Sequence, residues 1–78
     1  MRHRTIPDDT QKILTTISRF IREYRLQSGY TQQELAEISG IHYNTIHHIE
    51  SGHAHNIKSV IKLCLSLDLP LRELFWEL

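Results

Sequence analysis

Histidine is concentrated in the middle of this chain, where five of its six histidines lie between His42 and His55. Imidazole nitrogens bind metal ions, and imidazole changes its charge near neutral pH, so that a protonated ring attracts phosphate. His53 and His55 could chelate a metal, but no cysteine lies nearby and no two of these histidines have the four-residue spacing of metal-binding helices. We therefore expect no metal site and no cofactor, and histidines that face solvent or a polyanion.

The segment around these histidines combines hydrogen-bonding side chains with an absence of fixed positive charge. From Gly29 to Gly52 it contains neither lysine nor arginine. An asparagine amide can pair with the edge of adenine through two hydrogen bonds and needs no charge to do so. Enzymatic chemistry is not indicated, because the chain shows no phosphate-binding loop, no nucleophile–base arrangement and no paired carboxylates that the helix pattern does not explain.

Length, charge and cysteine content restrict the kind of protein. A chain of 78 residues forms one small domain, which we expect at 9–78 behind a basic arm at 1–8. The net charge is zero, but the part that ends at Tyr30 holds six Lys and Arg against three acidic residues. The single cysteine, Cys64, excludes an internal disulfide framework and is expected to be a small buried hydrophobe rather than a redox sensor. No membrane span or apolar signal core is found, so we expect a cytoplasmic protein.

Apolar residues recur at helical spacing throughout, and no alternating strand pattern is found. The sequence therefore predicts a compact all-α domain of five helices. We expect helices at about 9–28, 32–38 and 43–50, then one capped by Asn56 and a last one that starts at Pro70. The expected core positions are Ile13, Ile17, Phe20, Ile21, Tyr24, Leu35, Ile38, Ile41, Ile46, Ile49, Val60, Ile61, Cys64, Leu67, Leu71, Leu74 and Phe75.

The second and third expected helices form the best-defined motif of the sequence. Thr31-x-x-Glu34 is a capping box, and Tyr30 and Leu35 have the spacing of a hydrophobic staple. Gly40 permits a sharp turn between the two helices. Each helix is too short to be stable alone, so a fixed crossing must hold the pair together. The pattern predicts a helix-turn-helix, whose second helix presents its N-terminal residues to the major groove of DNA.

The spacing of particular residues extends this motif to a known family. These residues are Arg25, Gly29, Thr31, Gln32, Leu35, Ala36, Gly40, Ile41, Ile46, Ile49, Glu50 and Gly52, followed by the segment IKLCLSLDLPLREL. From roughly Ile17 to the C-terminus the chain resembles the lambda-repressor/Cro-type helix-turn-helix regulators, also called the xenobiotic-response-element (XRE) family. The resemblance implies a five-helix lambda-repressor-like fold, dimerisation and binding to a two-fold-symmetric operator.

The resemblance also assigns roles to the matching positions. Arg25 and Glu50 match a pair that ties the first helix to the end of the third, and Gln32 resembles the family's phosphate-anchoring glutamine. The expected base contacts are Tyr43, Asn44, Thr45 and His48. The expected phosphate contacts are Gln32, Gln33, His47, His53, His55 and Lys58, joined by Arg2 and Arg4 from the arm.

Two positions depart from the family pattern. The family usually has Ser or Thr where this chain has His42, so the third helix is expected to lose a strong N-cap at a cost of about 1 kcal/mol. The family usually has glycine at the position of Asp68, and aspartate tolerates a left-handed conformation less well than glycine. Neither departure is expected to threaten the fold.

The lack of lysine and arginine between Gly29 and Gly52 predicts that specificity and electrostatic attraction to DNA come from different residues. Base edges would be read without charge, while the free N–H groups that begin the second helix, with Gln32 beside them, would bind phosphate. Protonation of histidines that face DNA would add cations, so binding is expected to strengthen as the pH falls. Fixed cations surround the segment at Arg2, Arg4, Arg19, Arg22 and Lys58.

The C-terminal segment LRELFWEL has more apolar surface than a terminal helix needs to close a core. Trp76 has no further chain to cover it, and such a side chain indicates an interface. The alternative is that Trp76 packs on its own monomer. The expected dimer interface consists of Leu71, Phe75, Trp76 and Leu78.

The function expected from these features is that of a sequence-specific DNA-binding transcriptional regulator, such as a repressor, that acts as a homodimer on a palindromic operator. The helix at 43–50 would read the major groove. The alternative is an antitoxin-like module that binds a partner protein and has only weak DNA affinity. The zero net charge and the acidic residues Glu34 and Glu37 of the second helix favour this alternative.

Overall fold

The structure, a computed structural model, describes residues 9–53 and 56–77. Over these residues the chain forms five α-helices and no strand, which confirms the predicted all-α class. The helices are α1 (Thr10–Gln27), α2 (Gln32–Ser39), α3 (Tyr43–Glu50), α4 (Ile57–Ser66) and α5 (Leu71–Glu77). The basic arm expected at residues 1–8 lies outside the described residues.

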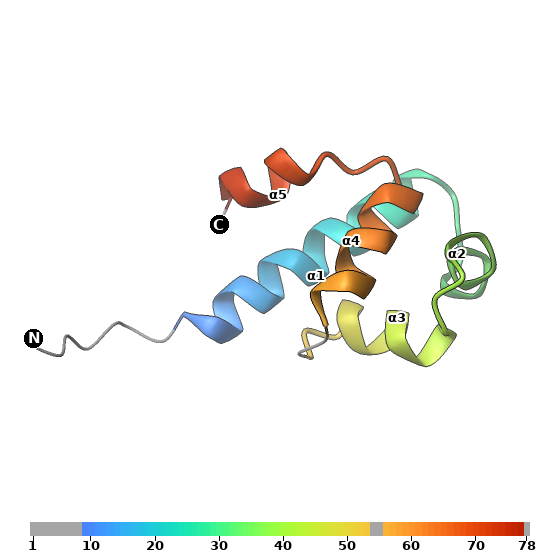
Figure 1. The fold of residues 1–78 in the computed structure, drawn as a ribbon, viewed down its shortest axis with the longest axis horizontal. Coiled ribbons are helices and arrows are strands. Elements are labelled where there is room, and N and C mark those ends of the chain that lie inside the picture. The colour runs from blue at the N-terminus through green and yellow to red at the C-terminus, as the bar shows by residue number, and fades with distance from the viewer. Residues whose placement is uncertain (1–8, 54–55, 78) are drawn as a thin grey trace, which may run out of the picture.

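The long first helix is the element around which the others are arranged (Figure 1). It contacts α3 on one side and α5 on the other, while α2 contacts both α3 and α4. Its start at Asp9 carries no side-chain capping bond, and its end follows from Gly29, whose φ of 80° is left-handed. The buried line of α1 is Ser18, Ile21 and Arg25.

One predicted core residue of α1 is not in the core. Ile13 is exposed, whereas Ile17, Phe20 and Tyr24 pack against the core as predicted. Ile13 lies in the first turns of α1, which project beyond the other helices toward the N-terminus (Figure 1). No opposing helix is therefore available to cover it.

The short helix α2 begins as the sequence predicts. The Thr31 hydroxyl accepts from the Glu34 N–H at 3.0 Å, and the Glu34 carboxylate accepts from the Thr31 N–H at 2.9 Å, which completes the capping box. The helix runs one residue further than expected and ends at Gly40, with φ 73°. The prediction for Ile38 was wrong, since Ile38 is about half exposed at the margin of the buried face that Leu35, Ala36 and Ser39 form.

The last two helices complete the core with one correction in α4. Leu63 is fully buried, but the sequence did not single it out, and Ile61, which was predicted to be buried, is exposed. Asp68 adopts a left-handed φ of 53°, so the turn expected there is present without glycine. The final helix begins at Leu71 rather than at Pro70, whose carbonyl accepts the first backbone bonds of α5.

All five helices enclose a single apolar core. Its members are Ile21, Leu35, Ala36, Ile46, Ile49, Val60, Leu63, Cys64, Leu67, Leu69 and Leu74. The fully buried side chains come from α1, α2, α3 and α4, so the short helices α2 and α3 are held mainly by packing against their neighbours. This packing fixes the surface that α3 leaves exposed.

Candidate nucleic-acid interface

A close crossing of α2 and α3 gives the candidate site its shape. Leu35 from α2 and Ile46 from α3 are both fully buried, and Ala36 supplies the small side chain that allows the backbones to approach. Gly40 makes the turn between the helices in the left-handed conformation that glycine adopts without strain. The pair is a helix-turn-helix, as predicted, with α3 as its second helix.

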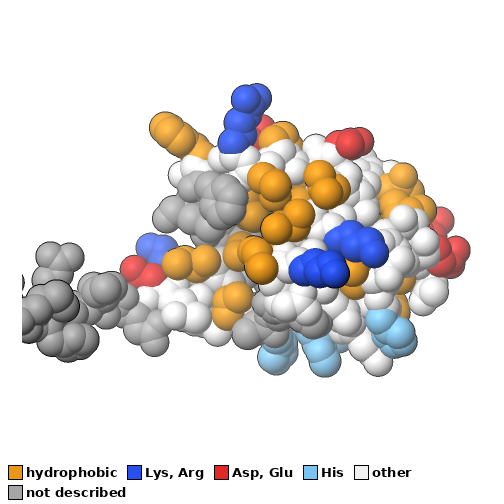
Figure 2. Space-filling model, viewed as in Figure 1, with side chains coloured by type: hydrophobic (Ala, Val, Ile, Leu, Met, Phe, Trp, Pro, Cys, Tyr) orange, Lys and Arg blue, Asp and Glu red, His pale blue; other side chains and the backbone are white. Residues whose placement is uncertain are grey.

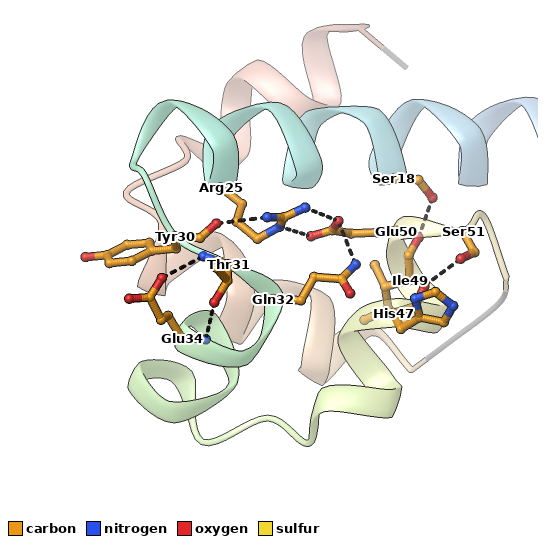
Figure 3. A network of polar contacts seen from close by, with 10 residues as sticks. All are labelled: Ser18, Arg25, Tyr30, Thr31, Gln32, Glu34, His47, Ile49, Glu50 and Ser51. Carbon is orange, nitrogen blue, oxygen red and sulfur yellow. Dashed lines mark hydrogen bonds and ion pairs between the residues drawn. The ribbon is translucent and has the colours of Figure 1, made fainter.

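An ion pair between α1 and the end of α3 holds this unit in place (Figure 3). Arg25 donates from Nε and Nη2 to the two carboxylate oxygens of Glu50, at 2.7 and 2.9 Å, and from Nη1 to the Tyr30 carbonyl at 2.8 Å. Both side chains are at least nine-tenths buried. The hydrogen bond to Glu50 is the main cause of a raised pKa of Arg25, which burial opposes. The geometry gives these two residues the structural role that the resemblance implies.

The same carboxylate also positions the first residue of α2. Gln32 donates from Nε2 to Glu50 Oε1 at 3.1 Å, and its side chain is only partly exposed (Figure 3). A primary amide has two N–H donors, so the bond to Glu50 orients Gln32 and leaves a second donor for another acceptor. Arg25 thus acts on Gln32 through Glu50 and not by direct contact.

A buried hydroxyl that the sequence analysis did not single out supports the C-terminal end of α3. The Ser18 hydroxyl of α1 donates to the carbonyl of Ile49, and the Ser51 hydroxyl donates to the carbonyl of His47 at 2.7 Å (Figure 3). These hydroxyls add a second donor to carbonyls that already accept the N–H groups of Gly52 and Ser51 in the turn after α3. The available signal was a serine inside the apolar face of α1, where a polar residue must find a partner.

The N-terminal end of α3 is capped, contrary to expectation. His42 adopts an extended N-cap conformation, and its Nδ1 accepts a hydrogen bond from the Asn44 N–H at 3.1 Å. The expected loss of a cap was wrong because a neutral imidazole offers one nitrogen lone pair as an acceptor. The absence of Ser or Thr at this position does not leave the helix uncapped.

The outward face of α3 carries aromatic and amide side chains. The predicted base contacts Tyr43, Asn44 and His48 are exposed on one surface, together with His47, which was predicted as a phosphate contact. The Tyr43 and His47 rings are stacked with centroids 6.3 Å apart, and the row continues through His48 to His53, with centroids 6.3 and 5.7 Å apart. Thr45 is only half exposed, and Gln33 is exposed at the start of α2.

Fixed positive charge borders this face without entering it. Figure 2 shows histidine side chains along the edge of the molecule formed by α3, with Lys and Arg side chains over α4 beside them. Lys58 of α4 is exposed, as are Arg19 and Arg22 of α1, and Arg19 lies 3.8 Å from Glu23. The predicted contacts His55, Arg2 and Arg4 lie outside the described residues.

Among the described residues, no three His, Cys, Asp or Glu side chains are grouped so as to hold a metal ion. His55 lies outside the described residues. The thiol of Cys64 is buried in the core, and burial raises its pKa to about 11. A thiol with that pKa is protonated at neutral pH, whereas the reactive form is the thiolate.

A second exposed surface lies on α4 and is apolar. Ile57, Ile61 and Leu65 are spaced by four residues and all are exposed, with Leu65 at 66%. Figure 2 shows hydrophobic side chains gathered over this part of the molecule. Ile61 was predicted to lie in the core, and Ile57 and Leu65 were not predicted to form a surface, although their i, i+4 spacing was the available signal.

Trp76 of α5 is 90% exposed, so the alternative in which it packs on its own monomer is wrong. It borders a groove together with Phe20, Arg72 and Glu73, and Glu73 accepts a hydrogen bond of 2.6 Å from the Tyr24 hydroxyl of α1. Leu71 is partly buried against the core. The other two predicted interface residues, the Phe75 side chain and Leu78, lie outside the described part.

The helix-turn-helix, clamped from inside and exposed along its second helix, defines a DNA-binding regulator. The chain belongs to the helix-turn-helix family HTH_3, whose model matches residues 21–74. It is also 28% identical over 57 residues to YgzD of Bacillus subtilis (strain 168), described as an uncharacterized HTH-type transcriptional regulator, which covers 72% of this chain and 86% of the relative. The predicted XRE-type family is thereby confirmed.

Proposed function

We propose that this chain is a sequence-specific transcriptional regulator that binds a palindromic operator as a homodimer, with α3 in the major groove. The observation that supports this most directly is the buried Arg25–Glu50 pair, which fixes α3 while leaving its outward face exposed. Reading of base edges requires that side chains be held in a set geometry, and a helix clamped from its inner side meets that requirement.

Base contacts are proposed for the residues near the start of α3. Tyr43 and Asn44 stand in its first turn and His48 one turn further on the exposed side, with the half-exposed Thr45 beside them. Asn44 is the side chain suited to a bidentate contact with adenine. Because these groups are uncharged or titratable, they contribute discrimination between bases rather than fixed electrostatic attraction.

Phosphate contacts are proposed for the border of the site. Gln32 and Gln33 begin α2, where unpaired N–H groups and the helix dipole favour an anion. His47 in the second half of α3 and His53 in the segment after it are both exposed. Lys58 lies in the first turn of α4. His55, Arg2 and Arg4 keep the phosphate role proposed for them from the sequence.

Dimerisation is proposed because one such small surface gives limited affinity, whereas two linked half-sites bind together. Trp76, at 90% exposure, supplies the aromatic side chain that interfaces favour. Leu71, Phe75 and Leu78 are proposed to join it, as the sequence predicts. The apolar face of α4 provides a further surface that a second copy could cover.

A second candidate function, binding of a partner protein with weak DNA affinity, is favoured by one observation. Ile57, Ile61 and Leu65 of α4 are exposed in a row, which is unusual for a surface that meets only water and nucleic acid. The acidic Glu34 and Glu37 on the exposed side of α2 point the same way, because they repel phosphate. In this case the fold would serve as a docking module.

Selection of bound duplexes from random DNA, at moderate salt and with the full chain, tests the proposal. We expect an enriched motif with two-fold symmetry and half-sites about one helical turn apart. Asn44→Ala serves as the matched variant, because it should select a motif that is degenerate at one base pair in each half-site. Recovery of no motif would contradict the proposal and favour the docking module.

A further inference from the structure

The N-cap of the proposed reading helix is a titratable group. His42 holds the N-cap position with φ −60° and ψ 141°, and its Nδ1 accepts from the Asn44 N–H at 3.1 Å. The imidazole is exposed, and it makes no other hydrogen bond to the described residues. One of the first, otherwise unpaired, N–H groups of α3 is therefore satisfied only while Nδ1 has a free lone pair.

This cap differs chemically from the usual ones. A serine, threonine or asparagine oxygen accepts a hydrogen bond at any pH near neutrality. An imidazole accepts through Nδ1 only when its proton is on Nε2, and in the protonated ring both nitrogens are donors. In the protonated ring, Nδ1 carries a hydrogen that faces the N–H of Asn44, so the hydrogen bond between them is lost. The ring then also places a positive charge at the N-terminal end of α3, which is the positive end of the helix dipole.

We propose that His42 is a positioning residue whose cap makes base discrimination by α3 depend on pH. This inference rests on the proposed function. When the ring gains a proton, the cap opens and the first turn of α3 loses its fixed geometry. Preference for the operator then falls, even though protonated histidines strengthen attraction to phosphate.

The loss is confined to the first turn because the other end of α3 is held separately. Glu50 is bound by Arg25, and the carbonyl of Ile49 accepts from Ser18. The N-terminal end has no comparable buried bond among the described residues, and the proposed readers Tyr43 and Asn44 stand directly after the cap. A helix of 8 residues gains little stability of its own, so a cap counts for a large share of its local order.

Charged and titratable side chains of three helices lie near the turn that holds His42. Glu37 of α2 lines the same shallow groove as His42 and Tyr43, and Tyr43 in turn stacks on His47 of α3. Lys62 of α4 reaches the turn, where its Nζ lies 3.5 Å from the position that a Cβ on Gly40 would occupy.

The test compares affinity for the selected operator with affinity for a scrambled duplex of equal length, at pH 8 and pH 6. Phosphate contacts are common to both duplexes, so the ratio of the two Kd values isolates discrimination from histidine–phosphate attraction. For the parent we expect this ratio to fall about fivefold from pH 8 to pH 6, the size expected from loss of one cap, while binding to the scrambled duplex strengthens.

Three variants at one position separate the cap from the other histidines. His42→Ser and His42→Asn keep a cap that does not titrate, so each should retain the high ratio at both pH values. His42→Ala has no cap and should show the low ratio already at pH 8. A constant ratio in the parent, an equal fall in His42→Ser, or a high ratio in His42→Ala would overturn the proposal.

A measurement without DNA distinguishes failure of this inference from failure of the proposed function. In the free protein, nitrogen chemical shifts of His42 should show Nδ1 unprotonated at pH 8, and the Asn44 amide signal should shift as the ring is protonated. The same amide should not respond in His42→Ser. If no DNA motif is selected, the proposed function fails. If the Asn44 amide signal does not change when His42 is protonated, the proposed role of the cap is overturned.

Discussion

The outward faces of α3 and α4 differ sharply although the two helices have similar buried faces. Each places aliphatic residues in the core, Ile46 and Ile49 from α3 and Val60 and Leu63 from α4. Toward solvent, however, α3 presents tyrosine, asparagine and histidines, whereas α4 presents the exposed row that begins at Ile57. The core requirement is the same, so the difference must come from what each outward face meets.

This difference is why we propose a polar partner for α3 and an apolar one for α4. Hydrogen-bonding side chains suit the edges of bases, while apolar side chains gain free energy only when another surface covers them. The fixed charges follow the same logic. Arg25 and Glu50 pair with each other inside the protein, and the outward face of α3 carries no Lys, Arg, Asp or Glu side chain.

The largest expected effect tests whether the buried ion pair holds α3. Glu50→Ala leaves the Arg25 guanidinium buried without its partner, and we expect the free energy of unfolding to fall by about 3–5 kcal/mol. Urea denaturation measures the change. Glu23→Ala is the control, because Glu23 faces Arg19 across 3.8 Å at the surface and should cost at most about 1 kcal/mol. Equal losses in the two variants would show that the buried pair does not fix α3.

Truncation of two leucines of α4 compares how much its buried face and its outward face contribute to stability. Leu63→Ala removes a fully buried side chain and should cost about 2–5 kcal/mol in unfolding free energy. Leu65→Ala truncates a side chain that is 66% exposed and should change the stability of the monomer by about 0.5 kcal/mol or less. Thermal unfolding of dilute protein measures both, and a large loss from Leu65→Ala would mean that this face is covered even in the monomer.

Trp76 of α5 tests whether exposed apolar residues outside α3 form the proposed dimer interface. Truncation of a buried interfacial aromatic commonly costs about 2 kcal/mol or more, so Trp76→Ala should weaken the dimer by that amount. Sedimentation equilibrium measures the dimer constant. Leu26→Ala is the control, since Leu26 is a 56% exposed apolar residue on α1 that we do not place at the interface. Unchanged association of the Trp76 variant would remove α5 from the interface.

The polar side of the comparison is tested at Asn44. Asn44→Ala should lose about 1–3 kcal/mol of discrimination at one base pair in each half-site. Because Asn44 is exposed and its backbone rather than its side chain takes the His42 cap, the urea midpoint should stay the same. Competition binding with single-base variants of the operator gives the discrimination. A variant with an unaltered base preference would show that Asn44 is not a reader.

The smallest expected effect is a loss of stability at high pH that comes from Cys64 on the buried face of α4. Burial raises the pKa of Cys64 from 9.0 to about 11, so the native state keeps a proton that the unfolded chain loses. The unfolding free energy should therefore fall by up to about 1.4 kcal/mol per pH unit between those values, with no such contribution below them. Chemical denaturation from pH 8 to 10.5 measures the slope. Cys64→Ala should be less stable throughout but should show a shallower decline, and parallel curves would contradict a buried neutral thiol.

Local signals in the sequence predicted most of the fold. The capping box at Thr31 and the glycines at positions 29 and 40 act through contacts a few residues apart, so the sequence alone was enough to place α2 and its ends. The Arg25–Glu50 pair is a long-range contact, and it was predicted only through the resemblance to a family.

Burial at the margins of each apolar stripe could not be predicted in the same way. Ile13, Ile38 and Ile61 fit a helical period as well as their buried neighbours do, yet all three are exposed. A period of 3.6 residues defines a face about 100° wide but does not say where a neighbouring helix stops covering it. That limit is set by the length and crossing of the partner helix, which the tertiary structure decides.

The sequence by itself determined that this chain is an all-α helix-turn-helix protein whose segment from Gly29 to Gly52 lacks lysine and arginine, because composition, caps and helical period are properties of neighbouring residues. Only the tertiary structure decided which groups meet across helices. It placed Glu50 between Arg25 and Gln32, and it turned Nδ1 of His42 toward the first turn of α3. Such contacts depend on crossing angles and rotamers, which follow from packing of the whole core.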